Sequence, residues 1–188
     1  MNALLYQQSA QGSAKTRDRR TNGASVKIVK KTICGTDLQS SVATYAPGPI
    51  LGHEGIGVVD KVGTAITAFH SGDRVIVSCI SSCGKCDYCR RGMYLHCVNG
   101  GWILGNKIDG TQAECVRIPF ADTSFYHIPS GAEEDALVTP MPLQTVWSHK
   151  IDPKQLITHR FKFDKILDAY DTFSAAAKTN ALKVLIEA

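Results

Sequence analysis

The stretch GHEGIGVVDKVGTAI, residues 52–66, decides the fold more than any other part of this sequence. It interleaves glycines with β-branched residues, and it is followed by the turn pair Gly72-Asp73 and the apolar run from Val75 to Ile80. Another β-rich segment, from Val26 to Ile33, precedes it. Short apolar segments separated by glycine-containing turns are typical of strands, so the middle of the chain is predicted to be mainly β.

Helical signals come only toward the C-terminus. Asp164 is placed to cap a helix whose apolar residues recur at helical spacing, namely Ile166, Leu167, Tyr170 and Phe173. Asp152-Pro153 marks another expected helix start, because proline suits the first helical turn. Residues 156–161 and 182–186 read as strands, and Asp109-Gly110 is expected to form a hairpin turn. The prediction is therefore a mainly β fold with short α segments.

Composition places the chain among globular proteins. Its 188 residues include 44% apolar and 20% charged residues, and no apolar run is long enough to cross a bilayer. The net charge of +4 is uneven, because residues 1–31 carry seven Lys or Arg against Asp18 alone. Residues 1–24 are predicted to be a polar, basic arm that lacks the aromatic residues needed to stack on bases. We expect a cytoplasmic protein without a secretory signal and with no nucleic-acid or membrane partner.

Four cysteines form the pattern C-x2-C-x2-C-x7-C within residues 81–101. Thiolates spaced in this way can turn toward one ion, which predicts a structural zinc held by Cys83, Cys86, Cys89 and Cys97. Disulfides are disfavoured, because the chain has seven cysteines, an odd number, and no secretory signal. An iron–sulfur cluster is the nearer alternative, but its common short spacing has fewer residues before the last cysteine. The lobe has few apolar residues, so the metal is expected to supply much of its folding energy.

A second metal site is suggested by Cys34 and His53, because a thiolate and an imidazole are both good zinc ligands. Taken alone, this pair would be better interpreted as a buried thiol and a structural histidine. The flanking residues change the balance. Residues 52–66 match in full the G-H-E-x2-G-x5-G-x2-[IVSAC] signature of zinc-containing alcohol dehydrogenases, and Cys34-Gly35-Thr36-Asp37 is similar to that family's first zinc-ligand segment. The sequence therefore resembles the medium-chain zinc alcohol dehydrogenases over roughly residues 25–188.

The resemblance implies a role for each residue of these two motifs. Cys34 and His53 would hold a catalytic zinc, and Glu54 would lie beside it and ligate transiently. Thr36 would hydrogen-bond the substrate alcohol and start a proton relay, and Asp37 would orient the imidazole of His53. In that family zinc lowers the pKa of the alcohol, and a hydride passes to the nicotinamide of NAD(P). The implied substrate is a small alcohol or carbonyl compound.

The resemblance also implies a nucleotide-binding Rossmann domain inserted in the catalytic domain, and we find no sequence signal for one. The nearest glycine-rich turn, in residues 55–60, lacks a third glycine and is followed by strand-like residues instead of a helix. We therefore predict a GroES-like β-barrel with a zinc-binding lobe and no doubly wound sheet. Its first segment would be residues 25–138, and residues 139–188 would be the returning segment of the same domain.

Two further positions bear on activity. Relatives supply another catalytic-zinc ligand just after the position of Val138, but Thr139-Pro140-Met141 offers none. Lys183 is similar to a basic position that approaches the cofactor phosphates, with a strand-edge charge as the equal alternative. The expected function is that of a truncated alcohol dehydrogenase catalytic domain with little NAD(P)-dependent turnover alone. The alternatives are a zinc-binding interaction module without enzymatic activity, and a half-enzyme completed by a separate nucleotide-binding chain. Apolar surface exposed without the cofactor domain would favour such pairing, or a homo-oligomer.

Overall fold

The computed structural model describes residues 22–42, 49–138 and 152–188. The strands in these ranges are β1 (Gly23–Thr32), β2 (Gly55–Val62), β3 (Arg74–Val77), β4 (Cys115–Pro119), β5 (Phe125–His127), β6 (Ile157–Lys162) and β7 (Lys183–Glu187). The helices are α1 (Gly35–Val42), α2 (Asp87–Arg90), α3 (Ala121–Ser124), α4 (Glu134–Leu137), α6 (Ile166–Ser174) and α7 (Ala176–Thr179). Short 3₁₀ turns span Tyr94–His96, Pro153–Leu156 and Phe163–Lys165.

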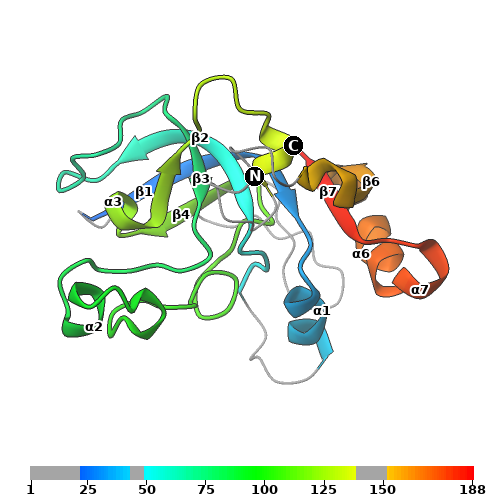
Figure 1. Cartoon of the computed structure of the whole chain (residues 1–188), viewed down its shortest axis with the longest axis horizontal. Coiled ribbons are helices and arrows are strands. Elements are labelled where there is room, and N and C mark those ends of the chain that lie inside the picture. The colour runs from blue at the N-terminus through cyan, green and yellow to red at the C-terminus, as the bar shows by residue number, and fades with distance from the viewer. Residues whose placement is uncertain (1–21, 43–48, 139–151) are drawn as a thin grey trace.

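Strand β1 organises the sheet. It pairs antiparallel with β2 along its length, from Ala24 opposite Val62 to Lys31 opposite Gly55. Its other edge is shared, because its first half pairs with β4 and its last residues pair with β7. The strand order is β5-β3-β2-β1-β7-β6, with β4 beside β1. Figure 1 shows α6 and α7 next to β6 and β7 at one end of the molecule, and α2 at the opposite end.

The predicted fold class is confirmed: the described residues form a mainly β structure with short helices and no doubly wound sheet. The predicted strands 156–161 and 182–186 are β6 and β7, and the predicted helix is α6. Its N-cap is Lys165 and not Asp164 as predicted, because Asp164 lies inside the preceding 3₁₀ turn. In the described part of the chain β5 and β6 are not paired with each other, so the strands form an open sheet instead of a closed barrel. No helix in these ranges is both long and apolar enough to cross a membrane.

Three other local predictions were wrong. Asp152-Pro153 opens only a single 3₁₀ turn, in which the Asp152 carboxylate accepts a hydrogen bond from the Lys154 backbone N–H. The chain turns at residues 105–107, and the carboxylate of Asp109 instead accepts from the backbone N–H of Ile50 at 3.1 Å. Strand β1 already begins at Gly23, inside the predicted arm, because pairing with β2 and β4 buries Ala24. The rest of the arm, residues 1–21, and the segment 139–151 lie outside the described residues.

The glycines of the stretch 52–66 allow strands to approach closely, and Gly57 is the clearest case. A Cβ at this position would lie 2.3 Å from the backbone oxygen of Lys27 on β1. Only glycine avoids this clash, so Gly57 permits the β1–β2 pairing that places the residues before β2 beside those after β1.

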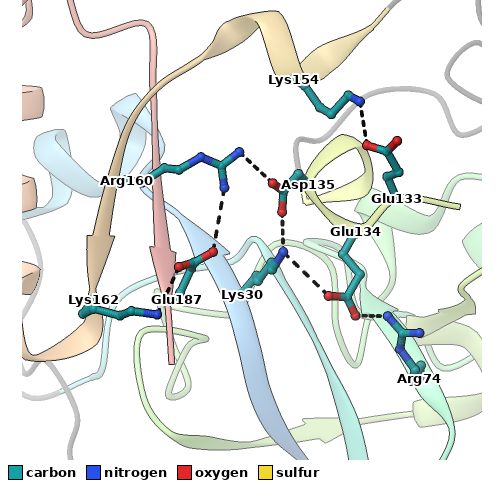
Figure 2. A network of polar contacts seen from close by, with 9 residues as sticks. All are labelled: Lys30, Arg74, Glu133, Glu134, Asp135, Lys154, Arg160, Lys162 and Glu187. Carbon is teal, nitrogen blue, oxygen red and sulfur yellow. Dashed lines mark hydrogen bonds and ion pairs between the residues drawn. The ribbon is translucent and has the colours of Figure 1, made fainter.

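The returning segment is joined to the first segment by a shared core and by ion pairs. Leu185 of β7 packs in one buried cluster with Ile56 of β2 and with Leu137 and Val138 at α4. The ion pairs form a network that we call the acidic clasp, in which three consecutive acids at α4 meet cations from β1, β3, β6 and the turn before β6 (Figure 2). Its members are Lys30, Arg74, Glu133, Glu134, Asp135, Lys154, Arg160, Lys162 and Glu187. Half-buried ion pairs in a network contribute more to stability than isolated exposed ones.

Asp135 is the centre of the clasp, so Asp135→Asn is expected to lower the free energy of unfolding by about 1–3 kcal/mol. Its carboxylate contacts Lys30 and lies 2.6 Å from Arg160 Nη2. Burial opposes its ionisation, but these two cations lower the pKa of Asp135 below its ordinary value. The stabilisation is therefore present above the pKa that Asp135 has in the unfolded chain, and it is lost as the pH falls below about 4.

Denaturant unfolding at neutral and acidic pH measures this effect. The control is Lys27→Gln, whose side chain is 66% exposed beside Asp60 and which should change stability by less than about 1 kcal/mol. Equal losses for the two variants at neutral pH would show that the clasp does not join the segments.

Candidate metal centres

Cys34, His53 and Glu54 converge because of the β1–β2 pairing. Cys34 lies just after β1, and His53 and Glu54 lie just before β2. Since Lys31 is opposite Gly55 in the register, these two flanking segments meet at the same end of the strand pair. One ligand atom from each of the three side chains lies within 4.8 Å of the others. The structure thus brings together the residues that the sequence predicts for a catalytic metal.

The surroundings of His53 assign a role to each of its ring nitrogens. Nδ1 lies 3.4 Å from Asp37 Oδ1, and Nε2 lies 3.4 Å from Thr36 Oγ1. With the Nδ1 proton held by Asp37, Nε2 is free to act as a ligand on the side of Cys34 and Thr36. Burial opposes a charge on this ring, but Asp37 and Cys34 outweigh it and raise the pKa of His53 to about 10. The predicted orienting role of Asp37 therefore has the geometry that it requires.

Asp37 is itself held in place. It is buried, and its Oδ2 accepts hydrogen bonds from the Cys34 backbone N–H at 2.9 Å and from Gln112 Nε2 at 3.2 Å. Gln112 belongs to a loop hydrogen-bonded along residues 50–52, and a Cβ on Gly52 would lie 2.6 Å from its Cγ. Glycine at this position, with φ of +94°, therefore lets the Gln112 side chain pass close to the backbone. Sequence reasoning missed Gln112, since no motif marks a glutamine 75 residues from its partner.

Glu54 is buried and is paired on one oxygen. Its Oε2 accepts a hydrogen bond from the Thr32 hydroxyl and lies 2.6 Å from Lys183 Nζ. The Lys183 side chain is only 12% exposed, so it is not a solvent-facing strand-edge charge, and its contact with a cofactor stays a prediction. Its observed partner is Glu54. The remaining oxygen of Glu54 leaves this carboxylate capable of a second contact.

The four cysteines of the lobe also converge. The ligand atoms of Cys83, Cys86, Cys89 and Cys97 lie within 4.8 Å of one another. The Cys83 backbone N–H donates to Cys97 Sγ at 3.2 Å, and a hydrogen bond from the Lys85 backbone lowers the pKa of Cys83 to about 6. All seven cysteines are free thiols. The predicted ligand set is therefore assembled at one point.

Both clusters fit zinc in the chemistry of their donors. Four thiols from one short segment match the closed ligand set of a structural zinc. A thiol, an imidazole and a carboxylate match the mixed ligands of a site that keeps an open position. The segment expected to lack a further ligand, 139–141, lies outside the described residues.

In metal-free protein, Cys34 should be alkylated as an activated thiol. Hydrogen bonding to His53 lowers the pKa of Cys34 to about 7, against the effect of burial, so its alkylation should be half-maximal near this pH. In His53→Ala the midpoint should move up toward the ordinary value of 9.0. Iodoacetamide labelling followed by peptide mass spectrometry measures this, with Cys115, whose pKa burial raises, as the internal reference. A midpoint that is the same in both proteins would contradict the assignment.

Comparisons with known proteins agree with this geometry. A family model described as the alcohol dehydrogenase GroES-like domain matches residues 20–130. A zinc-type alcohol dehydrogenase B of Aspergillus flavus is 36% identical over 115 residues, which cover 60% of this chain and 27% of the relative. An alcohol dehydrogenase of Cupriavidus necator is 34% identical over 148 residues, covering 66% of this chain and 39% of the relative. The chain thus spans about two fifths or less of the length of these two relatives.

A solved structure is similar over the whole chain. The apo form of zinc-dependent alcohol dehydrogenase 2 from Streptococcus pneumonia superposes with a TM-score of 0.89 and 26% identity, covering 100% of this chain and 98% of that one. The family match, the relatives and the two converged ligand sets lead to one conclusion. This chain belongs to the zinc-type alcohol dehydrogenases, of which it contains the GroES-like domain.

Proposed function

We propose that this chain is the zinc-binding catalytic domain of an alcohol dehydrogenase that interconverts a small alcohol and its carbonyl product with NAD(P). The observation that carries the proposal is the convergence of Cys34, His53 and Glu54 in one cluster, with Asp37 behind the histidine. Family membership supports the same chemistry.

Each residue of the cluster has a proposed task. A zinc ion bound there would lower the pKa of an alcohol hydroxyl. Cys34 Sγ and His53 Nε2 would be its ligands, and Asp37 would hold the proton on Nδ1, which leaves Nε2 as the nitrogen that loses its proton and binds the metal. The Thr36 hydroxyl, beside Nε2, would hydrogen-bond the alcohol and start a proton relay, in which it would give up its own proton toward solvent as it takes the proton of the alcohol. Glu54, already neutralised by Lys183, would contribute its second oxygen transiently.

The lobe has a separate, structural task. Cys83, Cys86, Cys89 and Cys97 would enclose a second zinc and leave no open position for a substrate. We further propose a cytoplasmic location, because reduced thiols in both clusters suit a reducing compartment.

We propose that this chain alone turns over slowly. Hydride transfer needs a nicotinamide placed beside the metal site, and the described residues include no doubly wound sheet to bind a dinucleotide. Lys183, the basic residue expected at the cofactor phosphates, is engaged by Glu54.

The test is an assay of zinc-loaded protein with a panel of alcohols and NAD or NADP, followed by the absorbance of the reduced nicotinamide. Turnover well below about 1 per second is expected for the chain alone, and a rate at or above this would refute the claim of low activity. The control is Cys34→Ser, which should abolish any residual rate. Residual activity unaffected by this substitution would contradict the proposed site.

Exposed apolar side chains in the lobe favour an interaction role as the second candidate. They are Tyr88, Met93, Tyr94, Leu95 and Val98. Exposed apolar side chains of this kind suit a homo-oligomer or a separate nucleotide-binding chain. A purified nucleotide-binding domain of a zinc alcohol dehydrogenase, added to the same assay, distinguishes a half-enzyme from an interaction module without activity. Recovered turnover would identify a half-enzyme.

A further inference from the structure

A chain of hydrogen bonds leads from helix α6 to His53. The Tyr170 hydroxyl lies 2.5 Å from Gln112 Oε1, Gln112 Nε2 lies 3.2 Å from Asp37 Oδ2, and Asp37 Oδ1 lies 3.4 Å from His53 Nδ1. These four residues come from four separate parts of the sequence, and three of them are buried.

The amide of Gln112 can work in only one orientation. Its nitrogen is a donor and its oxygen an acceptor, whereas the Asp37 carboxylate only accepts. With the amide reversed, its oxygen would face a buried carboxylate and Asp37 would lose one donor, which is costly where water cannot replace it. The Tyr170 hydroxyl stabilises the working orientation by donating to Oε1.

Tyr170 stays a donor over the physiological pH range. Burial raises the pKa of its hydroxyl well above the ordinary value, and Asp37 adds to this effect. The backbone of Gln112 is also fixed, since its N–H donates to Leu51 O at 3.0 Å and the N–H of Thr111 donates to Gly52 O at 2.9 Å. The backbone of Gln112 is therefore fixed, and the part of this residue that can still change its orientation is the side-chain amide.

We infer that Tyr170 is a positioning residue for the metal centre, which it reaches through Gln112, Asp37 and His53. The inference rests on the proposed function, because it takes the Cys34–His53 cluster to be a metal site. It gives the returning segment, which carries α6, a part in aligning a ligand that the first segment supplies.

The experiment measures zinc affinity at this site by competition with a chromophoric chelator. The site is identified as the equivalent that disappears in Cys34→Ser, and the lobe site serves as an internal reference. Outer-shell changes typically weaken a metal roughly 10–100-fold, so we expect about tenfold for Gln112→Leu and at least roughly threefold for Tyr170→Phe. Tyr126→Phe is the control, because it removes a hydroxyl from a half-exposed tyrosine that does not belong to the series of hydrogen bonds. It should change the zinc affinity of neither site.

The double variant separates positioning from general destabilisation. If Tyr170 acts through Gln112, then Tyr170→Phe adds no further loss once Gln112→Leu is present. Additive losses, or an equal fall at the lobe site, would overturn the inference. Wild-type affinity in Tyr170→Phe would overturn it while leaving the proposed function intact, whereas a wild-type protein without the Cys34-dependent equivalent would overturn both. Should Tyr170→Phe fail to fold, Gln112→Glu, which puts a second carboxylate against Asp37, tests the same link.

Discussion

Cys97→Ser is expected to release the zinc of the lobe and to unfold residues 81–101 while the sheet stays folded. In the fully described stretch from Cys83 to Gly100, the only buried residues are Cys89 and Cys97. No apolar core exists there to hold the stretch without a metal. In zinc-finger peptides a structural zinc contributes on the order of 10–16 kcal/mol of binding free energy, which is also the folding free energy of the site.

Limited proteolysis and metal analysis measure this effect. We expect rapid cleavage within the lobe of Cys97→Ser and the loss of one zinc equivalent, with the far-UV spectrum of the sheet largely retained. Cys115→Ser is the matched control, because Cys115 is half-buried on β4 and belongs to neither cluster. A lobe that resists protease equally in both variants would show that the thiols are not joined by an ion.

Lys31→Met is expected to stabilise the protein at neutral and acidic pH. Lys31 is fully buried, and its ammonium donates to Ala113 O at 3.0 Å and lies 3.5 Å above the centre of the Phe163 ring. Burial lowers the pKa of Lys31 from 10.5 to about 7, although the charges of Glu114 and Cys115 oppose the change. Such a lowering corresponds to roughly 5 kcal/mol of destabilisation when the amine is charged.

The sign of the pH dependence follows from linkage. Between the folded pKa of about 7 and the unfolded value near 10.4, the unfolded chain binds the additional proton, so wild-type stability rises with pH through this range. The cost is fully present below the folded pKa. Loss of the Ala113 hydrogen bond offsets roughly 1 kcal/mol, which leaves an expected gain of about 4 kcal/mol for Lys31→Met near pH 6 that shrinks toward pH 10.

Thermal unfolding of wild type and Lys31→Met across this pH range measures the difference in their stability. The contributions of other titrating groups cancel in this difference. Lys27→Met is the control from the same strand, since the Lys27 side chain is 66% exposed. If Lys31→Met had the same pH slope as wild type, the buried ammonium would not be the cause.

Sequence reasoning found the residues whose chemistry is local. Cysteines at metal-ligand spacing and the GHE motif mark their function by residue type, and the structure brings both ligand sets together. The strands β6 and β7 and the helix α6 were equally accessible, because their apolar periodicity reflects the core that they enter.

The partners of those residues were not accessible in the same way. Gln112, Tyr170 and Thr32 act through hydrogen bonds to residues 22 to 75 positions away, and no periodicity encodes such pairs. Resemblance assigned Lys183 to a cofactor, which stays a prediction, and the contact between its ammonium and Glu54, 129 positions away, had no sequence signal. Buried Lys31 was missed because a lysine in a strand gives no sign of its depth.

The most direct test of the account is the zinc content of purified protein and of the double variant Cys34→Ser/His53→Ala. Two sites are predicted, one per ligand cluster, with the lobe zinc held tightly and the second released more readily by a chelator. The double variant should retain the lobe zinc and lose only the other. A wild-type protein with zinc in the lobe alone, or a double variant with unchanged zinc content, would contradict the claim that Cys34 and His53 form a metal centre.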